Sequence, residues 1–187
     1  MASTPEPETP RQRLFFALWP PEAVVQRLRD LQRKALDGID GRRIAADRLH
    51  LTLRFIGSVD THTADCLKTA AAAIRIPPFT LEIDHLGVFP RAQVVWAGVS
   101  HPPPELLDLA GKLERICRDC DLPPESRPFA PHLTLLRKAP RHVRLSRTAI
   151  DPVVWPVREF VLVASDTRPE GAVYTVVERW PLQAPGD

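Results

Sequence analysis

One tetrapeptide that contains a histidine and a threonine occurs twice in this sequence. The tetrapeptide HLTL occurs at residues 50–53 and again, letter for letter, at residues 132–135. In an extended strand the side chains alternate between two faces, so the His and Thr of each copy share one face and the leucines share the other. Histidine exchanges a proton near neutral pH, and a threonine hydroxyl can hold an anionic oxygen. Such strands lying side by side indicate acid–base chemistry at a phosphorus centre, without a serine or cysteine nucleophile.

A single copy of HLTL would be an ordinary half-buried strand whose polar side chains face water. The chain contains only six histidines, however, and two of them lie in identical tetrapeptides. This repetition favours two similar halves whose strands meet in one cleft. We therefore take His50, Thr52, His132 and Thr134 as the candidate catalytic residues.

The bulk composition limits the class of protein. With 187 residues, of which 44% are hydrophobic, the chain can form one large domain or two small lobes with a shared core. The net charge of +2 is too small to indicate nucleic-acid binding by bulk charge, but it is compatible with a local basic cleft. Neither a signal peptide nor an apolar run of ~20 residues is present, so we expect no membrane segment. An odd number of cysteines does not make a disulfide framework and predicts a reducing, cytoplasmic location.

The order of segments predicts an α+β fold. Residues 1–11 are acidic and proline-rich and predict a disordered tail, which leaves residues 12–187 as a single domain. Apolar periodicity and the positions of proline and glycine predict the following elements. They are a strand within 13–21, a helix from Pro21 to about Asp37-Gly38, a strand at 43–59, a helix at 63–76, paired strands at 79–89 and 94–99, a helix after 102–104 that ends near Cys120, a strand at the second HLTL, and a hairpin from 160–164 and 173–180. The mixture is typical of helices that cover sheets.

Five segments resemble the bacterial and archaeal RNA 2',3'-cyclic phosphodiesterases, also called 2'-5' RNA ligase-like proteins, of the 2H phosphoesterase superfamily. They are RLFFALWPP, LHLTLRFIG, VVWAGV, RPFAPHLTLLR and YTVVERWPL, and they span residues 13–182 in the matching order. The resemblance implies a bilobal fold, with two pseudo-symmetric antiparallel sheets, helices on the outside and a central groove that holds both motifs.

The resemblance also implies an activity and the residues that perform it. The expected reaction is hydrolysis of RNA 2',3'-cyclic phosphate ends to 2'-phosphomonoesters, with no metal and no other cofactor. His50 would be the proton donor and His132 the proton acceptor, while Thr52, Thr134 and Arg137 would hold the phosphate. The repeated motif is symmetric, so the sequence itself leaves the two histidine roles interchangeable. Reversible 2'-5' ligation of RNA, or RNA binding without turnover, stay open as alternatives.

Arg137 has an unexpected position for this role. It lies five residues after His132, so simple alternation would place it on the opposite face of the strand. A bulge or a turn after Leu135 is therefore required.

Other chemical groups are set outside the site. Cys117-x-x-Cys120 is interpreted as structural, because no second cysteine pair completes a zinc site. A two-histidine metal site is disfavoured because each motif offers threonine instead of a carboxylate. Most of the remaining histidines are expected to be solvated: His62, His85, His101 and His142.

Aromatic and basic residues offer two further interpretations. Four aromatic residues could stack on a base, although core packing is the simpler account of each: Phe16, Trp96, Phe129 and Tyr174. Five arginines could guide an RNA backbone, although a solvated face explains them equally well: Arg42, Arg43, Arg48, Arg54 and Arg91.

Overall fold

A computed structural model describes residues 11–145, 147–168, 171–184 and 186. The disordered tail expected at residues 1–11 lies outside the described residues, apart from Arg11. The single domain expected at 12–187 stays a prediction. The strands are β1 (Gln12–Leu18), β2 (Arg42–Arg43), β3 (Leu51–Val59), β4 (Phe79–Phe89), β5 (Val94–Gly98), β6 (His132–Arg137), β7 (Thr148–Val157), β8 (Glu159–Arg168) and β9 (Gly171–Pro181). The helices are α1 (Glu22–Ala35), the short 3₁₀ helix η1 (Ala46–Arg48), α2 (Thr61–Ala72) and α3 (Pro104–Asp119).

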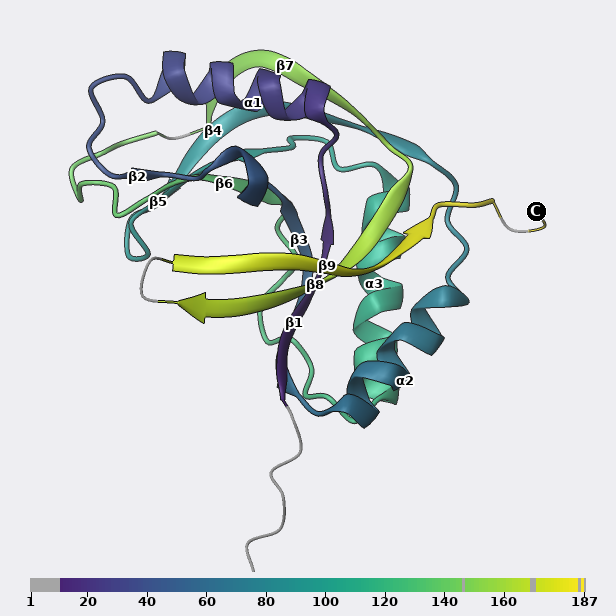
Figure 1. Ribbon diagram of the computed structural model, residues 1–187. Coiled ribbons are helices and arrows are strands. Elements are labelled where there is room, and N and C mark those ends of the chain that lie inside the picture. The colour runs from purple at the N-terminus through teal and green to yellow at the C-terminus, as the bar shows by residue number, and fades with distance from the viewer. Residues whose placement is uncertain (1–10, 146, 169–170, 185, 187) are drawn as a thin grey trace, which may run out of the picture.

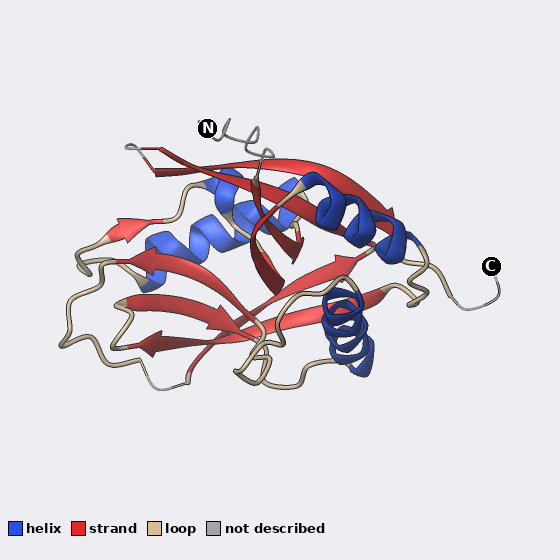
Figure 2. Cartoon of the chain, turned by 90° about the horizontal axis from the view of Figure 1, so that it is seen from below, coloured by secondary structure: helices blue, strands red, loops and turns tan. Residues whose placement is uncertain are grey.

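The strands form one antiparallel sheet with two halves. The strand order is β7-β4-β5-β6-β3-β1-β8-β9, and β2 pairs with β6 beside this path. The two halves meet at β3 and β6, which are joined through the single pair Leu51 and Leu133. Figure 2 shows the strands in two groups, one above the other in that view. The α+β fold expected from the sequence is therefore confirmed, with the two expected sheets joined at the centre.

β1 pairs with β3 on one edge and with β8 on the other, and its residues from Leu14 to Leu18 are buried on both faces of the sheet. Leu14, Phe16 and Leu18 belong to the main core, while Phe15 and Ala17 belong to a smaller apolar cluster on the other face. A strand covered on both sides reads as a continuous apolar run, which explains its sequence LFFAL.

The three longer helices lie on the outside of the sheet (Figure 1). α1 begins directly after Pro21, and its buried face contains Val24, Val25 and Leu28. α1 packs against β7, whereas α3 packs against β3 and α2 lies beside α3. Each motif-bearing half of the sheet thus has its own helical support.

Several expected element boundaries are wrong. The strand expected at 43–59 is divided into β2, η1 and β3, so the first HLTL motif begins just before β3. The helix expected at 63–76 spans Thr61–Ala72. β7 was not predicted, because Pro152 and Pro156 interrupt its pattern. Proline is tolerated there because β7 is the last strand of the sheet.

The cysteines also differ from the expectation. Cys66 in α2 and Cys120 at the end of α3 form a disulfide, with a Cα–Cα distance of 6.0 Å. The prediction that the cysteines form no disulfide is therefore wrong, and the cysteine count no longer supports a reducing location. Cys117 is free and buried, and desolvation raises the pKa of its thiol to about 11. The structural interpretation of Cys117-x-x-Cys120 agrees with this burial, since a protonated thiol is a poor nucleophile.

Candidate active site

The two HLTL motifs lie side by side at the centre of the sheet. Leu51 and Leu133 are fully buried and pair with each other across β3 and β6. The neighbouring His50, Thr52, His132 and Thr134 are only partly buried. The alternation expected from the sequence is thus present in both copies, and the fold brings the four polar residues together.

A β-bulge returns Arg137 to the face of the sheet that carries Thr134. In the β5–β6 ladder, Val95 pairs with Leu136 and Trp96 pairs with Thr134, so Leu135 is an extra residue. Leu135 and Leu136 are both buried, and Arg137 follows as an exposed residue. The bulge that the sequence required is therefore present.

The first motif contains the matching bulge. In the β1–β3 ladder, Phe16 pairs with Arg54 and Ala17 pairs with Thr52, which leaves Leu53 as the extra residue. Phe55 then occupies the position in β3 that Arg137 occupies in β6. The two strands therefore share a backbone irregularity and differ in the side chain that it presents.

A buried side chain fixes the backbone next to each bulge. The carbonyl of Leu135 accepts hydrogen bonds from the Ile44 N–H and from Gln32 Nε2 of α1, both at 2.9 Å. In the other half, Arg54 donates to the Phe55 carbonyl and contacts Glu114 of α3, with Nε–Oε2 at 2.5 Å. Arg54 and Gln32 are both less than a tenth exposed.

A cavity of about 460 Å³ opens along this face. Its walls include four of the five expected site residues, namely His50, Thr52, Thr134 and Arg137. His132 is not among the lining residues. It nevertheless lies close enough that its positive charge lowers the pKa of His50.

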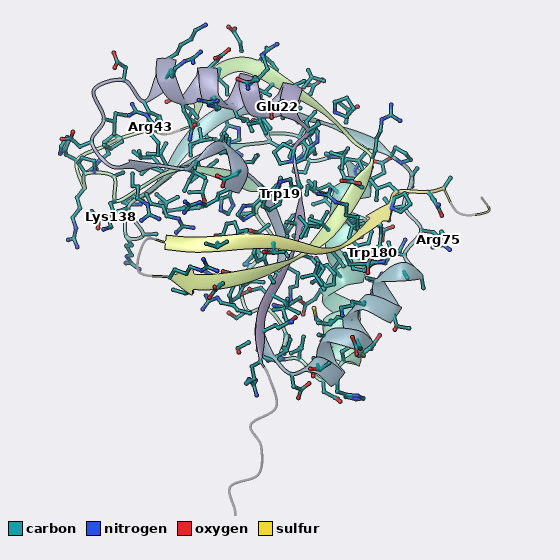
Figure 3. The ribbon with its side chains drawn as sticks, in the orientation of Figure 1. Trp19, Glu22, Arg43, Arg75, Lys138 and Trp180 are labelled. Atoms are coloured by element: carbon teal, nitrogen blue, oxygen red, sulfur yellow. A yellow bond between two sulfur atoms is a disulfide. The ribbon has the colours of Figure 1, made fainter. Side chains whose placement is uncertain are left out.

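His50 is enclosed by aromatic rings. Trp19 stacks on the imidazole at 5.5 Å between ring centroids, and Phe15 and Tyr174 lie at 5.0 and 5.3 Å. Trp19 is placed between the start of α1 and the β8–β9 hairpin (Figure 3). Desolvation, together with the smaller effect of the positive charges of Arg137 and His132, lowers the pKa of His50 to about 4.

His132 has a different aromatic environment. Its ring meets Phe89 edge-on at 5.2 Å and Trp96 at 6.1 Å. The indole of Trp96 lies so close to the backbone that a Cβ on Gly87 would be only 2.2 Å from it, so glycine is required there. Burial lowers the pKa of His132 as well, and Arg137 contributes to this shift.

The two imidazoles are oriented in the same way. His50 Nδ1 lies 2.7 Å from the carbonyl of Arg48, and His132 Nδ1 lies 2.7 Å from the carbonyl of Ala130. A carbonyl oxygen only accepts hydrogen bonds, so each Nδ1 carries the proton. In both residues Nε2 is therefore left for the transferred proton.

The aromatic candidates and the remaining histidines differ in burial and in their distance from the motifs. Phe16 is fully buried and Phe129 packs against the core, whereas Trp96 and Tyr174 contact the motif histidines. His85 is the exception among the four remaining histidines, because it is 5% exposed and its Nδ1 lies 2.7 Å from Asp84 Oδ1. The other three histidines are exposed as expected: His62, His101 and His142.

Several cavity residues were not predicted as part of the site. They include Arg13, Phe55, Ser165 and Thr167. Arg13 and Phe15 alternate along β1, and Ser165 and Thr167 alternate along β8. This two-residue period was readable in the sequence, but nothing in the sequence showed that β8 lies beside β1.

Among the described residues, no group of three or more His, Cys, Asp or Glu side chains is placed to hold a metal ion. In the same part of the chain, every helix is too short or too polar to cross a membrane.

Comparisons with known proteins agree with this geometry. A family model described as the 2'-5' RNA ligase superfamily matches residues 17–169. The RNA 2',3'-cyclic phosphodiesterase of Escherichia coli K12 is 37% identical over 171 residues, which cover 91% of this chain and 97% of the relative. The Thermus thermophilus protein of that name is 31% identical, covering 91% of this chain and 90% of its own length. A crystal structure of E. coli LigT complexed with 3'-AMP superposes with a TM-score of 0.84 at 37% identity, covering 92% of this chain and 99% of LigT. The chain therefore belongs to the 2'-5' RNA ligase superfamily, whose motifs its sequence resembles.

Proposed function

We propose that this protein hydrolyses the 2',3'-cyclic phosphate at the end of an RNA strand and leaves a 2'-phosphomonoester. The observation that carries the proposal is the convergence of two HLTL motifs and Arg137 on one face of the sheet. The relatives named RNA 2',3'-cyclic phosphodiesterase support the same reaction. The E. coli LigT complex with 3'-AMP supports a groove that accepts a nucleotide with a 3'-phosphate.

The reaction consumes one water molecule. His132 Nε2 accepts a proton as the water oxygen attacks phosphorus, and His50 Nε2 donates a proton to the 3'-oxygen as its bond to phosphorus breaks. The diester thereby becomes a monoester that stays attached to the 2'-oxygen. Thr52, Thr134 and Arg137 donate hydrogen bonds to the remaining phosphoryl oxygens, where negative charge develops. This scheme requires neither a metal nor a covalent intermediate, and full activity in excess chelator would agree with it.

His50 can donate a proton only when its ring is protonated, and the substrate promotes this protonation. Because the pKa of His50 is about 4 in the free protein, its ring is mostly neutral at pH 7. An anionic phosphate beside the imidazole raises its pKa and allows it to take up the proton that it later donates. The anionic substrate thus creates its own general acid.

The donor and acceptor roles can be separated with a modified substrate. Replacing the 3'-oxygen by sulfur provides a leaving group that departs without protonation. We expect this substrate to restore most of the activity of His50→Ala and little of the activity of His132→Ala. Rescue of His132→Ala alone would reverse the two roles.

One assay tests the proposed reaction against both alternatives. A short RNA ending in a 2',3'-cyclic phosphate is incubated with the protein, together with a strand that carries a 5'-hydroxyl. A new 2'-phosphate end supports hydrolysis, a joined strand supports 2'-5' ligation, and bound but unchanged RNA supports a binding module. A cytoplasmic location remains a prediction, which cell fractionation would test.

A further inference from the structure

The arginines near the first motif have different environments in the structure. Arg43 donates to the carbonyl of Leu36, and Arg54 is buried against Glu114. Arg91 lies on the exposed turn between β4 and β5. Of the five arginines considered in the sequence, only Arg42 and Arg48 line the same cavity as His50 and Arg137. Their place in the wall of this cavity therefore separates Arg42 and Arg48 from the other three arginines.

The cavity contains more positive charge than one phosphate requires. Among the described residues, its walls contain no Asp or Glu, and four arginines line it: Arg13, Arg42, Arg48 and Arg137. A cyclic phosphodiester carries a single negative charge, for which Arg137 is already placed beside the threonines. Clustered like charges destabilise a fold unless an anion compensates them.

The four guanidinium groups are not equivalent. Arg13 lies over the ring of Phe55, 4.9 Å from its centroid. Arg42 forms no ion pair with any carboxylate of the described residues. Arg48 has only a distant contact of 4.0 Å with the adjacent Asp47, whose carboxylate is largely exposed. Arg42 and Arg48 are thus the cavity cations with the least compensation inside the described part of the protein.

Backbone pairing places these two arginines beside the reacting groups. Arg42 of β2 pairs directly with Arg137 of β6, so their side chains leave neighbouring strands at the same level. The carbonyl of Arg48 accepts the hydrogen bond from His50 Nδ1. The pair is therefore attached to both halves of the catalytic site.

The β8–β9 hairpin brings the two guanidinium groups together. A Cβ built on Gly171 would lie 3.0 Å from Arg42 Nη2 and 3.1 Å from Arg48 Nη1. Two cationic groups that approach one point so closely can share one phosphate group between them. Ser165 and Thr167 of β8 line the same cavity and provide neutral hydroxyl donors.

We propose that Arg42 and Arg48 form a second phosphate subsite that binds the 5'-phosphate of the terminal nucleotide. In an RNA strand this phosphate links the terminal nucleotide to the preceding one. The substrate of the site would then be the end of an RNA chain in preference to a free cyclic nucleoside phosphate. This inference rests on the proposed function, because Arg137 and the threonines must hold the cyclic phosphate.

The kinetic test compares two substrates that differ only at the 5' position. A nucleoside 2',3'-cyclic phosphate and its 5'-phosphorylated form are hydrolysed by wild type, Arg42→Ala, Arg48→Ala and the double variant. We expect the 5'-phosphate to raise kcat/KM of the wild type about 10-fold to 100-fold, as charged hydrogen bonds usually do. The double variant should reduce this ratio to near one. Arg43→Ala and Arg91→Ala are matched controls that should keep the wild-type ratio.

A binding test separates the subsite from turnover. Titration calorimetry compares adenosine 3',5'-bisphosphate with 3'-AMP on the same proteins, and the extra phosphate should improve wild-type affinity about tenfold or more. The double variant should lose this gain and also show a weaker salt dependence. Because removing like charges should not unfold the protein, an unchanged or higher Tm would exclude loss of fold.

The outcomes distinguish the two levels of the proposal. If the wild type hydrolyses both substrates equally, or the double variant keeps the ratio, the subsite is wrong and the proposed function stands. If the wild type hydrolyses neither these two substrates nor a short RNA that ends in a 2',3'-cyclic phosphate, the proposed function is wrong. The subsite is then still decided by calorimetry, where equal affinity for the two ligands would overturn it.

Discussion

The two copies of HLTL have the same sequence but lie in different environments. The ring of His50 stacks on Trp19 and is enclosed by Phe15 and Tyr174, and it lines the cavity. The ring of His132 meets Phe89 and Trp96 and lies outside the cavity wall. A repeated motif therefore provides two equivalent bases, and the neighbouring strands make them unequal.

The residues after the bulges extend this comparison. The second half presents Arg137, whose charge can stabilise a phosphate, and the first half presents the aromatic ring of Phe55. Gln32 of α1 supports the backbone before Arg137, and the Arg54–Glu114 ion pair supports the backbone before Phe55. The same bulge thus presents a charge that can stabilise a phosphate in β6 and a flat apolar ring in β3.

Removing either motif histidine should have the largest effect. We expect His50→Ala and His132→Ala each to lower kcat on a 2',3'-cyclic phosphate by about 10²–10⁴, the usual contribution of general acid–base catalysis. Single-turnover rates measure this loss, and the exposed His62→Ala is the control. Activity of either variant close to wild type would show that the motifs do not act together.

Substitution of the residues that follow the two bulges should give the next largest effect on the reaction. Arg137→Ala removes a charged donor to the phosphate and should lower kcat by about 10²–10³. Phe55→Ala, at the matching position, should change mainly KM, because stacking holds the ligand without meeting the developing charge. A larger kcat loss for Phe55→Ala than for Arg137→Ala would reverse our interpretation of the two halves.

The lowered pKa values predict an acidic pH optimum. One histidine must be neutral and the other protonated, so kcat/KM of the free enzyme peaks between their two pKa values. The pKa of His50 is lowered to about 4 and that of His132 lies below 6.5. We expect the optimum between these limits, with kcat/KM falling about tenfold per pH unit on the alkaline side. An optimum of kcat/KM above pH 7 would contradict this environment.

The stability of the protein should depend on pH through the same residue. The folded state disfavours the protonated form of His50, so it binds fewer protons than the unfolded chain between about pH 4 and 6.5. The free energy of unfolding should therefore fall as pH is lowered through this window, by roughly 3 kcal/mol from His50. Denaturant titrations of wild type and His50→Gln measure it, and equal slopes against pH would oppose the burial of His50.

Gln32 should affect the site indirectly and by the smallest amount. Gln32→Leu leaves the carbonyl of Ile44 without the Gln32 donor and weakens the support of Leu135, so we expect about 1–3 kcal/mol lower stability. Since this backbone positions Arg137, kcat should fall by less than tenfold while KM changes little. Gln26→Leu, on the exposed face of the same helix, is the matched control. If the two variants were equally stable, Gln32 would not support the backbone at Leu135.

Local sequence patterns predicted the polar face of each motif and the need for a bulge before Arg137. Both depend on the two-residue period of a strand, which can be read without knowing its neighbours. The stacking of Trp19 on His50 and the approach of Arg48 to the hairpin depend on strand registers and could not be predicted. The same reason explains Cys66–Cys120, since the partners are 54 residues apart in the chain. β7 was missed because edge-strand prolines hide its pattern.

The most direct test of one shared site is the double variant His50→Ala/His132→Ala. If both imidazoles act on the same phosphate, either single loss already disables the reaction, and the two losses do not multiply. We predict that the double variant hydrolyses a cyclic phosphate RNA end within a few-fold of the weaker single variant. A double loss equal to the product of the single losses would mean that the histidines act independently, which would contradict the shared groove.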